Sequence, residues 1–248
     1  METEVFNATV EVDIENEIAE ENSKSLDSKI LPEAYLDQLE DEYDRYATEC
    51  EAGMQKALLS IHSLSAAFDR SGKRNPFDRI ESRIKTFKSV KGKCKDRGYE
   101  LTSPSIQEHI KDVAGIRIIT KYLDEISLVK DMILQIPEIN IISIKDYVSQ
   151  PKENGYKSVH LQCQVGVYDP FRGSRMRPLE IQIRTKTMNL WASLDHDINY
   201  KNPNHMPEVE EKFLHIAEIL SQLEEEAMSL RDYCEAAKET SSASADLL

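Results

Sequence analysis

The sequence predicts a mixed α/β (α+β) fold, in which a β-sheet of about five strands is flanked by helices. Two observations lead to this prediction. Short runs that are β-branched or that alternate between apolar and polar residues recur through the middle of the chain, and the segments around them carry apolar residues every three to four positions. At 248 residues, the chain can form one large domain or two small ones with a sizeable core.

The first part of the chain predicts an extension, then helices, then a charged strand. Residues 1–28 are polar and acidic without sustained periodicity, so we expect little structure there. Apolar residues from Leu31 to Leu64 follow the repeat of amphipathic helices, and turn residues follow at 71–76. Residues 77–85 then alternate, with one charged face made of Arg79, Glu81, Arg83 and Lys85.

Two helices with recognisable end signals come next. Residues 89–97 read as a helix that ends at Gly98. Ser103 is the expected N-cap of the following helix, with Pro104 at its first helical position, and that helix runs toward Lys111.

Three further strands are expected in the middle of the chain. Residues 116–122 form a β-branched run typical of a central strand, and Asp124 can cap a helix that reaches Leu134. Residues 139–148 and 159–167 read as strands on either side of a polar loop that contains proline and glycine.

The strand expected at 179–185 has two different faces, and a basic, flexible loop at 168–178 leads into it. Because side chains alternate along a strand, its aliphatic residues fall on one face and its polar residues on the other. The polar residues are a carboxylate, an amide and a guanidinium, namely Glu180, Gln182 and Arg184. Such a set suits a metal and an anionic substrate, and a merely solvated outer face is the alternative.

The end of the chain predicts two more helices. Residues 185–200 form a helix that turns Met188 and Trp191 toward the core, and residues 202–207 form a turn. A long amphipathic helix then runs from 208 to about 237 and leads into a frayed tail.

Charge is unevenly distributed along the chain. The formal net charge is −14, yet residues 1–45 hold 15 acids against 3 bases and residues 208–248 hold 11 against 3, which leaves 19 acids against 25 bases in the middle. Within the middle, residues 69–97 carry 11 bases and 4 acids. A basic segment inside an acidic protein suggests a local anion site, with a solvated charge run as the alternative, and nucleic acid is not an expected partner.

Other sequence features indicate a cytoplasmic protein. No run of about 18 apolar residues is present, and the acidic N-terminus does not resemble a signal peptide, so no membrane association is expected. The four cysteines are scattered without CxxC or Cys/His clustering, which suggests reduced thiols and neither a disulfide framework nor a zinc site.

Two carboxylates near basic residues point to phosphoryl-type chemistry. Asp112 precedes one strand and Glu180 lies in another, and paired carboxylates with lysine and arginine suit Mg²⁺ and a polyphosphate. The chain contains no GxxxxGK[ST], GxGxxG or protein-kinase motif set.

Five motifs carry a resemblance to a known family. They are Arg83-Ile-Lys85 with Ser89, Lys93 and Arg97; Lys111-Asp112-Val-Ala-Gly-Ile-Arg117; Pro151-Lys152-Glu-Asn154-Gly-Tyr156-Lys-Ser-Val-His160; Glu180-Ile-Gln182-Ile-Arg184-Thr; and Trp191-Ala-Ser-Leu-Asp195-His196. In this order they resemble the synthetase domain of the RelA/SpoT superfamily, and the chain is similar to its stand-alone small alarmone synthetases.

The resemblance implies a nucleotidyltransferase-like RelA/SpoT synthetase fold with a long C-terminal helix. It implies a catalytic domain at 29–207 and an oligomer contact in a homotetramer at 208–248. The implied activity is that of a GTP pyrophosphokinase, which transfers the pyrophosphoryl group of ATP to the 3′-hydroxyl of GTP or GDP, giving pppGpp or ppGpp and AMP.

Site roles follow from the same resemblance. Asp112 and Glu180 are the implied catalytic residues and Mg²⁺ ligands, and Glu180 can also assist deprotonation of the attacking hydroxyl. The implied ATP-binding residues are Arg83 and Arg117, which sandwich adenine, with Lys85, Ser89, Lys93 and Arg97. The implied GTP- or GDP-binding residues are Lys152, Asn154, Tyr156, His160 and Gln182, with Tyr156 stacking on guanine.

Two alternatives remain open. The chain could pyrophosphorylate the 3′ end of tRNA, as toxins of the superfamily do, or it could be a catalytically inactive alarmone-binding module. The sequence also leaves open the preference between GTP and GDP, allosteric activation by pppGpp, and the roles of the acidic extension, Arg184 and Asp195.

Overall fold

The computed structural model describes residues 31–201 and 207–245. The extension expected at 1–28 and most of the turn expected at 202–207 lie outside these residues. Residues 41–248 form one compact unit, whereas residues up to Glu40 belong to another, so only the first described residues of helix α2 fall outside the main unit.

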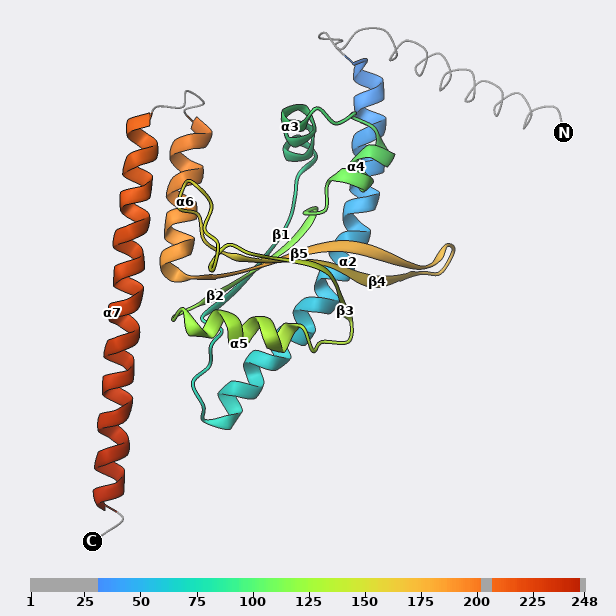
Figure 1. The fold of residues 1–248 in the computed structure, drawn as a ribbon. Helices are drawn as coiled ribbons and strands as arrows, with labels where there is room; N and C mark the ends of the chain where they lie inside the picture. The colour runs from blue at the N-terminus through green and yellow to red at the C-terminus, as the bar shows by residue number, and fades with distance from the viewer. Residues whose placement is uncertain (1–30, 202–206, 246–248) are drawn as a thin grey trace, which may run out of the picture. The chain divides into compact units, whose positions relative to one another are not determined.

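The fold is built around a five-stranded mixed sheet with the strand order β1-β2-β5-β4-β3 (Figure 1). The central pair β2 and β5 is parallel, and every other neighbouring pair is antiparallel. This sheet confirms the predicted fold class. The strands are β1 (Arg79–Ile84), β2 (Ala114–Thr120), β3 (Ile139–Asp146), β4 (Val159–Asp169) and β5 (Gly173–Thr185).

Helices surround the sheet. In Figure 1, α5 lies on one side of the sheet, and α3 and α4 lie on the other. No helix among the described residues is long and apolar enough to span a membrane. The helices are α2 (Glu33–Ser71), α3 (Phe87–Arg97), α4 (Ser103–His109), α5 (Asp124–Ile133), α6 (Lys186–Lys201) and α7 (Pro207–Ala245).

One face of the sheet forms the core, as the alternation of β5 predicted. Leu179, Ile181 and Ile183 are fully or almost fully buried. On this face, Gly53 of α2 lies against Val165 of β4. Helix α5 contacts β5 and is itself buried along its apolar stripe. Burial of this face is the main stabilising contribution to the sheet.

The register places polar residues of four strands in two rows on the opposite face. Arg83, Gly115, Glu180 and Gln162 are successive partners across β1, β2, β5 and β4 and make the first row. The second row consists of Glu81, Arg117, Gln182 and His160. Residues in register share a face, so four separate strands contribute to one polar surface.

Several predicted helix starts are wrong by one to three residues. The N-caps of α3 and α4 are Thr86 and Thr102, whose side chains accept hydrogen bonds from the backbone N–H groups of Ser89 and Ser105. Ser103 is therefore inside its helix. Asp124 lies in the first turn of α5 and is not its cap, since the capping position belongs to Leu123 and has no side-chain hydrogen bond. A carboxylate in the first turn is still favourable there because of the helix dipole.

The prediction of a loop at 168–178 is also wrong, because most of these residues belong to β4 or β5. β4 and β5 form a long hairpin in which Asp169 pairs with Gly173, and Gly173 supplies the positive φ of the turn. The segment lacks an alternating apolar pattern, so only its pairing with β4 reveals it as a strand. Pro178 is tolerated because β2 pairs with β5 only from Glu180 onward, which leaves this part of β5 an edge.

Helix α7 packs on α6 and extends beyond the predicted end at 237 to Ala245. The Trp191 indole N–H donates to the carbonyl oxygen of Phe213 at 3.1 Å, and both side chains are buried. The buried carboxylate of Glu224 accepts hydrogen bonds from the hydroxyls of Thr185 and Thr187, which connects α7 to the junction between β5 and α6.

The core face of the sheet can be tested by a matched pair of substitutions. Ile181 of β5 and Ile144 of β3 both align with Leu161 of β4, but Ile181 is 0% exposed and Ile144 is 45% exposed. We expect Ile181→Ala to lower the free energy of unfolding by about 2–5 kcal/mol, because it removes buried methyl groups and leaves a cavity. Ile144→Ala should change it by less than about 1 kcal/mol. Urea denaturation of both variants measures this, and equal losses would contradict the placement of Ile181 at the buried centre of this face and of Ile144 at its exposed edge.

Candidate active site

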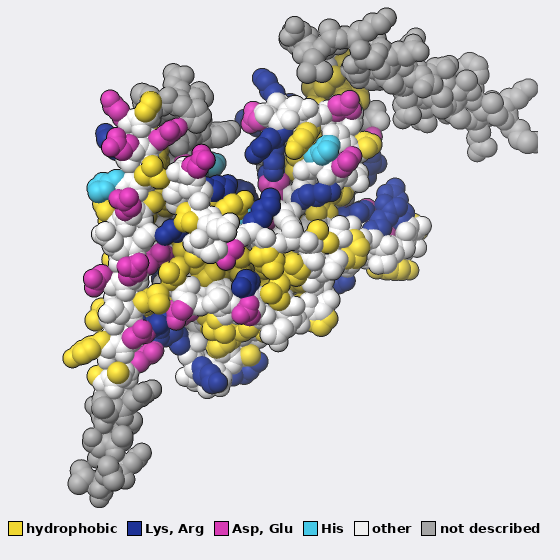
Figure 2. All heavy atoms as spheres, in the orientation of Figure 1, with side chains coloured by type: hydrophobic (Ala, Val, Ile, Leu, Met, Phe, Trp, Pro, Cys, Tyr) yellow, Lys and Arg dark blue, Asp and Glu magenta, His cyan; other side chains and the backbone are white. Residues whose placement is uncertain are grey.

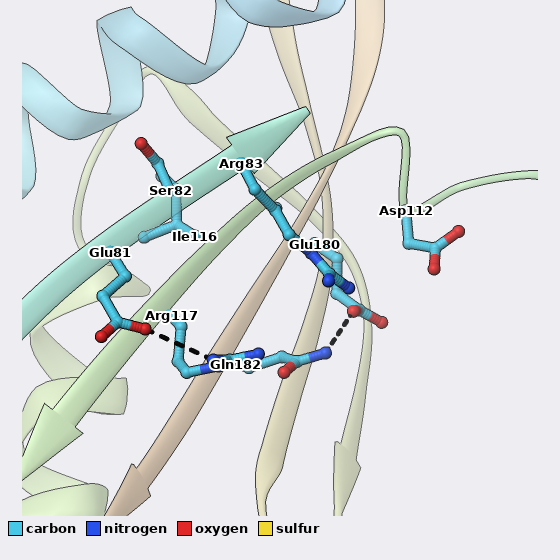
Figure 3. A pocket seen from close by; sticks show the side chains of 9 residues that line it. Glu81, Ser82, Arg83, Asp112, Ile116, Arg117, Glu180 and Gln182 are labelled. Atoms are coloured by element: carbon cyan, nitrogen blue, oxygen red, sulfur yellow. Dashed lines mark hydrogen bonds and ion pairs between the residues drawn. The ribbon is translucent and has the colours of Figure 1, made fainter. Parts of the chain in front are cut away.

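A pocket lies over the two polar rows, close to the loop that leads into β2 (Figure 3). Figure 3 shows Arg83 extending toward Glu180, while Asp112 projects from the loop. Figure 2 shows lysine and arginine side chains gathered near α3, and acidic side chains along α7, in agreement with the charge distribution of the sequence. The pocket is lined by Glu81, Ser82, Arg83, Asp112, Gly115, Ile116, Arg117, Glu180 and Gln182.

Asp112 is held between two lysines. Lys85 Nζ lies 2.5 Å from Asp112 Oδ2, and Lys93 Nζ lies 2.8 Å from Oδ1. Burial by itself would raise the pKa of Asp112, but the hydrogen bonds and positive charges of the two lysines outweigh burial, so its pKa is lowered. The carboxylate therefore stays ionised although only a fifth of its side chain is exposed.

Glu180 is likewise held as a carboxylate, but by polar neighbours on its own face of the sheet. Its Oε1 accepts hydrogen bonds from Gln162 Nε2 at 3.0 Å and from His160 Nδ1 at 3.3 Å, and its Oε2 accepts one from Gln182 Nε2 at 2.6 Å. Burial would raise the pKa of Glu180, but His160 and Gln182 outweigh that effect and lower it. A lowered pKa suits a metal ligand or an electrostatic role.

The two arginines expected around adenine both line the pocket. Arg117 Nη1 contacts the Glu81 carboxylate at 3.3 Å, whereas its buried Nε has no hydrogen-bond partner among the described residues. Gly115 stands between Arg83 and Glu180 in the first row and lines the pocket, and a Cβ added there would lie 4.0 Å from Arg83 Cγ and 4.0 Å from the Glu180 backbone oxygen.

The loop at 151–158 carries three of the five expected acceptor residues, namely Lys152, Asn154 and Tyr156. Its turn closes through the Gly155 N–H, which donates to the carbonyl oxygen of Lys152, and Gly155 has a φ of +85° that other residues rarely adopt. The Asn154 side chain accepts from the backbone N–H of Tyr156. Lys152 Nζ lies 4.9 Å from the centre of the Tyr156 ring. The tyrosine hydroxyl reaches His160 Nε2 at 2.7 Å, which connects the loop to the second polar row.

Arg184 of β5, whose role the sequence left open, is buried and contacts this loop at Tyr156. Its Nη2 donates to the Tyr156 hydroxyl at 2.6 Å and to Gln182 Oε1 at 2.7 Å. Burial lowers its pKa. No carboxylate forms an ion pair with it in the part of the chain that the structure describes.

The structure brings most of the predicted site residues together. Lys85, Lys93 and Arg184 contact residues of the pocket directly. Ser89 and Arg97 lie one helical turn on either side of Lys93 on α3, but neither lines the pocket, and the Ser89 hydroxyl contacts Thr86 at 2.9 Å. Likewise, Asp195 is not among the lining residues, so its role stays open.

Two residues of the site were missed as functional candidates. Glu81 partners Arg117, and Gln162 partners Glu180. The alternation of their strands placed each on a polar face, which is the signal that could have identified them.

The donor set fits a magnesium ion bound together with phosphates. Asp112 and Glu180 line one pocket, and Mg²⁺ in phosphoryl-transfer sites is commonly held by one or two carboxylates and substrate oxygens. Among the described residues there is no cluster of three or more His, Cys, Asp or Glu side chains arranged for a metal, so protein ligands alone would leave the coordination incomplete.

Comparison with known proteins gives consistent matches. Residues 82–205 match the family described as "Region found in RelA / SpoT proteins". GTP pyrophosphokinase YwaC from Bacillus subtilis (strain 168) is 37% identical over 158 residues, which cover 63% of this chain and 75% of YwaC. GTP pyrophosphokinase YjbM from the same organism is 27% identical over 191 residues, which cover 77% of this chain and 89% of YjbM.

Solved structures show the same fold. A GTP pyrophosphokinase family protein from Streptococcus pneumoniae aligns with a TM-score of 0.71 and 27% identity, over 79% of this chain and 96% of that one. Small alarmone synthetase 1 from Bacillus subtilis, bound to its product pppGpp, aligns with a TM-score of 0.71 and 26% identity, over 77% and 97% of the two chains. This chain therefore belongs to the RelA/SpoT family and resembles its small alarmone synthetases.

Proposed function

We propose that this chain is a GTP pyrophosphokinase that makes (p)ppGpp on the polar face of its sheet. The activity predicted from the sequence agrees with the names of the two Bacillus relatives. The observation that carries the site assignment is the strand register, which brings the expected donor residues Arg83 and Arg117 beside the expected acceptor residues Gln182 and His160.

On the donor side, Arg83 and Arg117 take the adenine of ATP between their guanidinium planes. Lys85 and Lys93, which neutralise Asp112 in this structure, take the phosphates. The spacing of α3 also directs Ser89 and Arg97 toward the same side of the helix as Lys93. The burial of Lys85 lowers its pKa, although the Asp112 hydrogen bond opposes that effect. When ATP binds, the Lys85 ammonium group would move from the Asp112 carboxylate to a phosphate, and so exchange one anionic partner for another.

On the acceptor side, Tyr156 stacks on guanine, and Lys152, Asn154, His160 and Gln182 surround the nucleotide and its phosphates. The arrangement of the loop supports this assignment, because Tyr156 and His160 contact each other at 2.7 Å and His160 contacts Glu180. The residues expected to bind the acceptor are thus directly connected to the residue expected to meet its 3′-hydroxyl.

In the reaction, the 3′-hydroxyl oxygen of GTP or GDP forms a bond to the β-phosphorus of ATP, and the bond from that phosphorus to the α,β-bridging oxygen breaks. The bridging oxygen leaves with its electron pair as part of AMP, and the hydroxyl proton is released to solvent. Mg²⁺ held by Asp112 and Glu180 would neutralise developing phosphate charge. Arg83, Lys85 and Lys93 add further positive charge on the donor side. The lowered pKa of Glu180 makes it a weak base, so we assign it chiefly to metal binding and to orienting the hydroxyl.

We also propose that α7 contributes to a homotetramer and that the protein acts in the cytoplasm. Leu223, Leu230 and Tyr233 of α7 are more than half exposed, and an exposed apolar stripe on a helix suits a subunit contact. Light scattering on the purified protein measures the oligomeric state directly.

The activity itself is tested with labelled ATP and an unlabelled acceptor. We expect AMP and a pyrophosphorylated guanosine nucleotide to appear together when Mg²⁺ is present, and both to stop when the metal is chelated. GTP, GDP and tRNA are offered in separate reactions, and thin-layer chromatography separates the products. Transfer to tRNA alone would support the toxin-type activity, and nucleotide binding without AMP release would support an inactive binding module.

Glu180→Gln should abolish turnover while the protein stays folded. The amide preserves the shape of the side chain but removes the charge that binds the metal, so we expect kcat to fall by more than about a hundredfold. Glu225→Gln is the control, because Glu225 is exposed on α7 and does not line the pocket. Full activity of the Glu180→Gln variant would show that Glu180 does not have the assigned role in metal binding.

Arg83→Met should separate the donor site from the acceptor site. Loss of one adenine-stacking guanidinium should raise the KM for ATP by about tenfold or more while the KM for GTP changes little. Arg175→Met, on the exposed β4–β5 hairpin, removes the same charge away from the pocket. Steady-state kinetics with each substrate varied in turn give both constants, and a larger effect on GTP would reverse the assignment.

A further inference from the structure

Five side chains on the acceptor side form a closed ring of hydrogen bonds. Glu180 contacts His160 at 3.3 Å, His160 contacts Tyr156 at 2.7 Å, and Tyr156 contacts Arg184 at 2.6 Å. Arg184 then contacts Gln182 at 2.7 Å, and Gln182 returns to Glu180 at 2.6 Å. Both oxygens of the Glu180 carboxylate are therefore connected to Arg184, one through two side chains and the other through one.

The direction of each bond follows from Arg184. A guanidinium can only donate, so the Tyr156 oxygen accepts from it and the Tyr156 hydroxyl proton is free to point at His160 Nε2. When that nitrogen accepts, the Nδ1–H on the other side of the His160 ring is the group that donates to Glu180. Along the other path, Gln182 accepts through Oε1 and donates through Nε2. Arg184 thus sets the orientation of every member of the ring.

Among the described residues, the Arg184 side chain has no comparable partner outside the ring. It is only 6% exposed, and its one other side-chain hydrogen bond within that part of the chain is a long one of 3.4 Å to the Ser158 hydroxyl, at the base of the acceptor loop. A buried guanidinium is costly when its charge and donors are unmatched. Here its partners are Tyr156, Gln182 and Ser158, which all belong to the acceptor loop or the acceptor face.

Arg184 also packs beside the tyrosine ring. Its guanidinium carbon lies over the Tyr156 ring, 5.1 Å from the ring centre, so Arg184 contacts both the face of the ring and its hydroxyl. An aromatic ring fixed in this way loses less conformational freedom when it stacks on a base.

We propose that Arg184 is a positioning residue for the acceptor nucleotide: it fixes Tyr156 and Gln182 for guanosine nucleotide binding and aligns them with Glu180. The proposal rests on the acceptor-side assignment of the proposed function. It predicts that Arg184 governs affinity for the acceptor and leaves donor affinity largely unchanged, because its contacts do not include Arg83, Arg117 or Lys85.

The test measures both binding and turnover. Trp191 is the single tryptophan of the chain, and its ring lies 6.0 Å from that of Tyr156, so its fluorescence can report GTP binding in the absence of catalysis. Arg184→Met should raise the Kd and the KM for GTP by about tenfold or more, with the KM for ATP within about twofold of its original value. Arg184→Lys, which keeps the charge and can still donate, should restore part of the affinity.

A double-mutant cycle identifies the route of the effect. Tyr156→Phe keeps the ring and removes the hydroxyl, and it should also weaken GTP binding. If Arg184 acts through that hydroxyl, the Arg184→Met and Tyr156→Phe double variant should bind GTP more tightly than the sum of the two single effects predicts. Should Arg184→Met fail to fold, the Arg184→Lys and Tyr156→Phe variants provide the same cycle.

Arg177→Met is the matched control. Arg177 also belongs to β5 and is largely buried, but it pairs with Glu49 and does not line the pocket. It should alter the unfolding temperature without a selective change in GTP affinity. A general packing effect of Arg184 would instead affect ATP and GTP equally, or would appear in Arg177→Met as well, and either result overturns the proposal.

The outcomes separate the two proposals. A wild-type protein that makes (p)ppGpp but whose GTP affinity does not depend on Arg184 overturns only the role of Arg184. A wild-type protein that binds GTP in an Arg184-dependent way without turnover overturns the pyrophosphokinase activity and leaves the role of Arg184 supported. The absence of both GTP binding and turnover overturns both.

Discussion

The parallel pairing of β2 with β5 is the constraint on which the rest of the site depends. It places Gly115 beside Glu180 and Arg117 beside Gln182, and the antiparallel neighbours then add residues of β1 and β4 to the same two rows. A slip of one residue would turn each of these side chains toward the core and expose the aliphatic face. Burial of that face therefore maintains the alignment of the polar face, so the stability of the sheet and the geometry of the site have one cause.

Charge compensation is the second requirement of this pocket. Two carboxylates are kept ionised in a partly buried place, Asp112 by two lysines and Glu180 by His160 and Gln182, and each pKa is lowered although burial acts in the opposite direction. These two ways of keeping a carboxylate ionised suit different roles in the proposed reaction. In the proposed mechanism the lysines at Asp112 would move to a phosphate of ATP, whereas His160 and Gln182, the donors at Glu180, are held by the sheet itself.

The loop at 151–158, which is proposed to bind the acceptor, is held in place by contacts with helix α7 and with Arg184 of β5. Gly155 approaches α7 so closely that an added Cβ atom would lie 2.7 Å from the Cβ of Ala217, and Lys157 Nζ contacts the Ser221 hydroxyl at 2.8 Å. Arg184 supports the same loop from the sheet. The long C-terminal helix therefore supports the loop proposed to bind the acceptor, and it also carries an exposed apolar stripe.

The sequence by itself determined the five strands, the two faces of β5 and the family, because period-two alternation and ordered motifs are local properties. It misassigned the residues at 173–178, which have no alternation and become strand only through pairing with β4. It also left Arg184 undecided. Strand order, and the contact of Arg184 with a tyrosine 28 residues away, were decided only by the tertiary structure, because hydrogen bonds between distant segments leave no pattern in the local sequence.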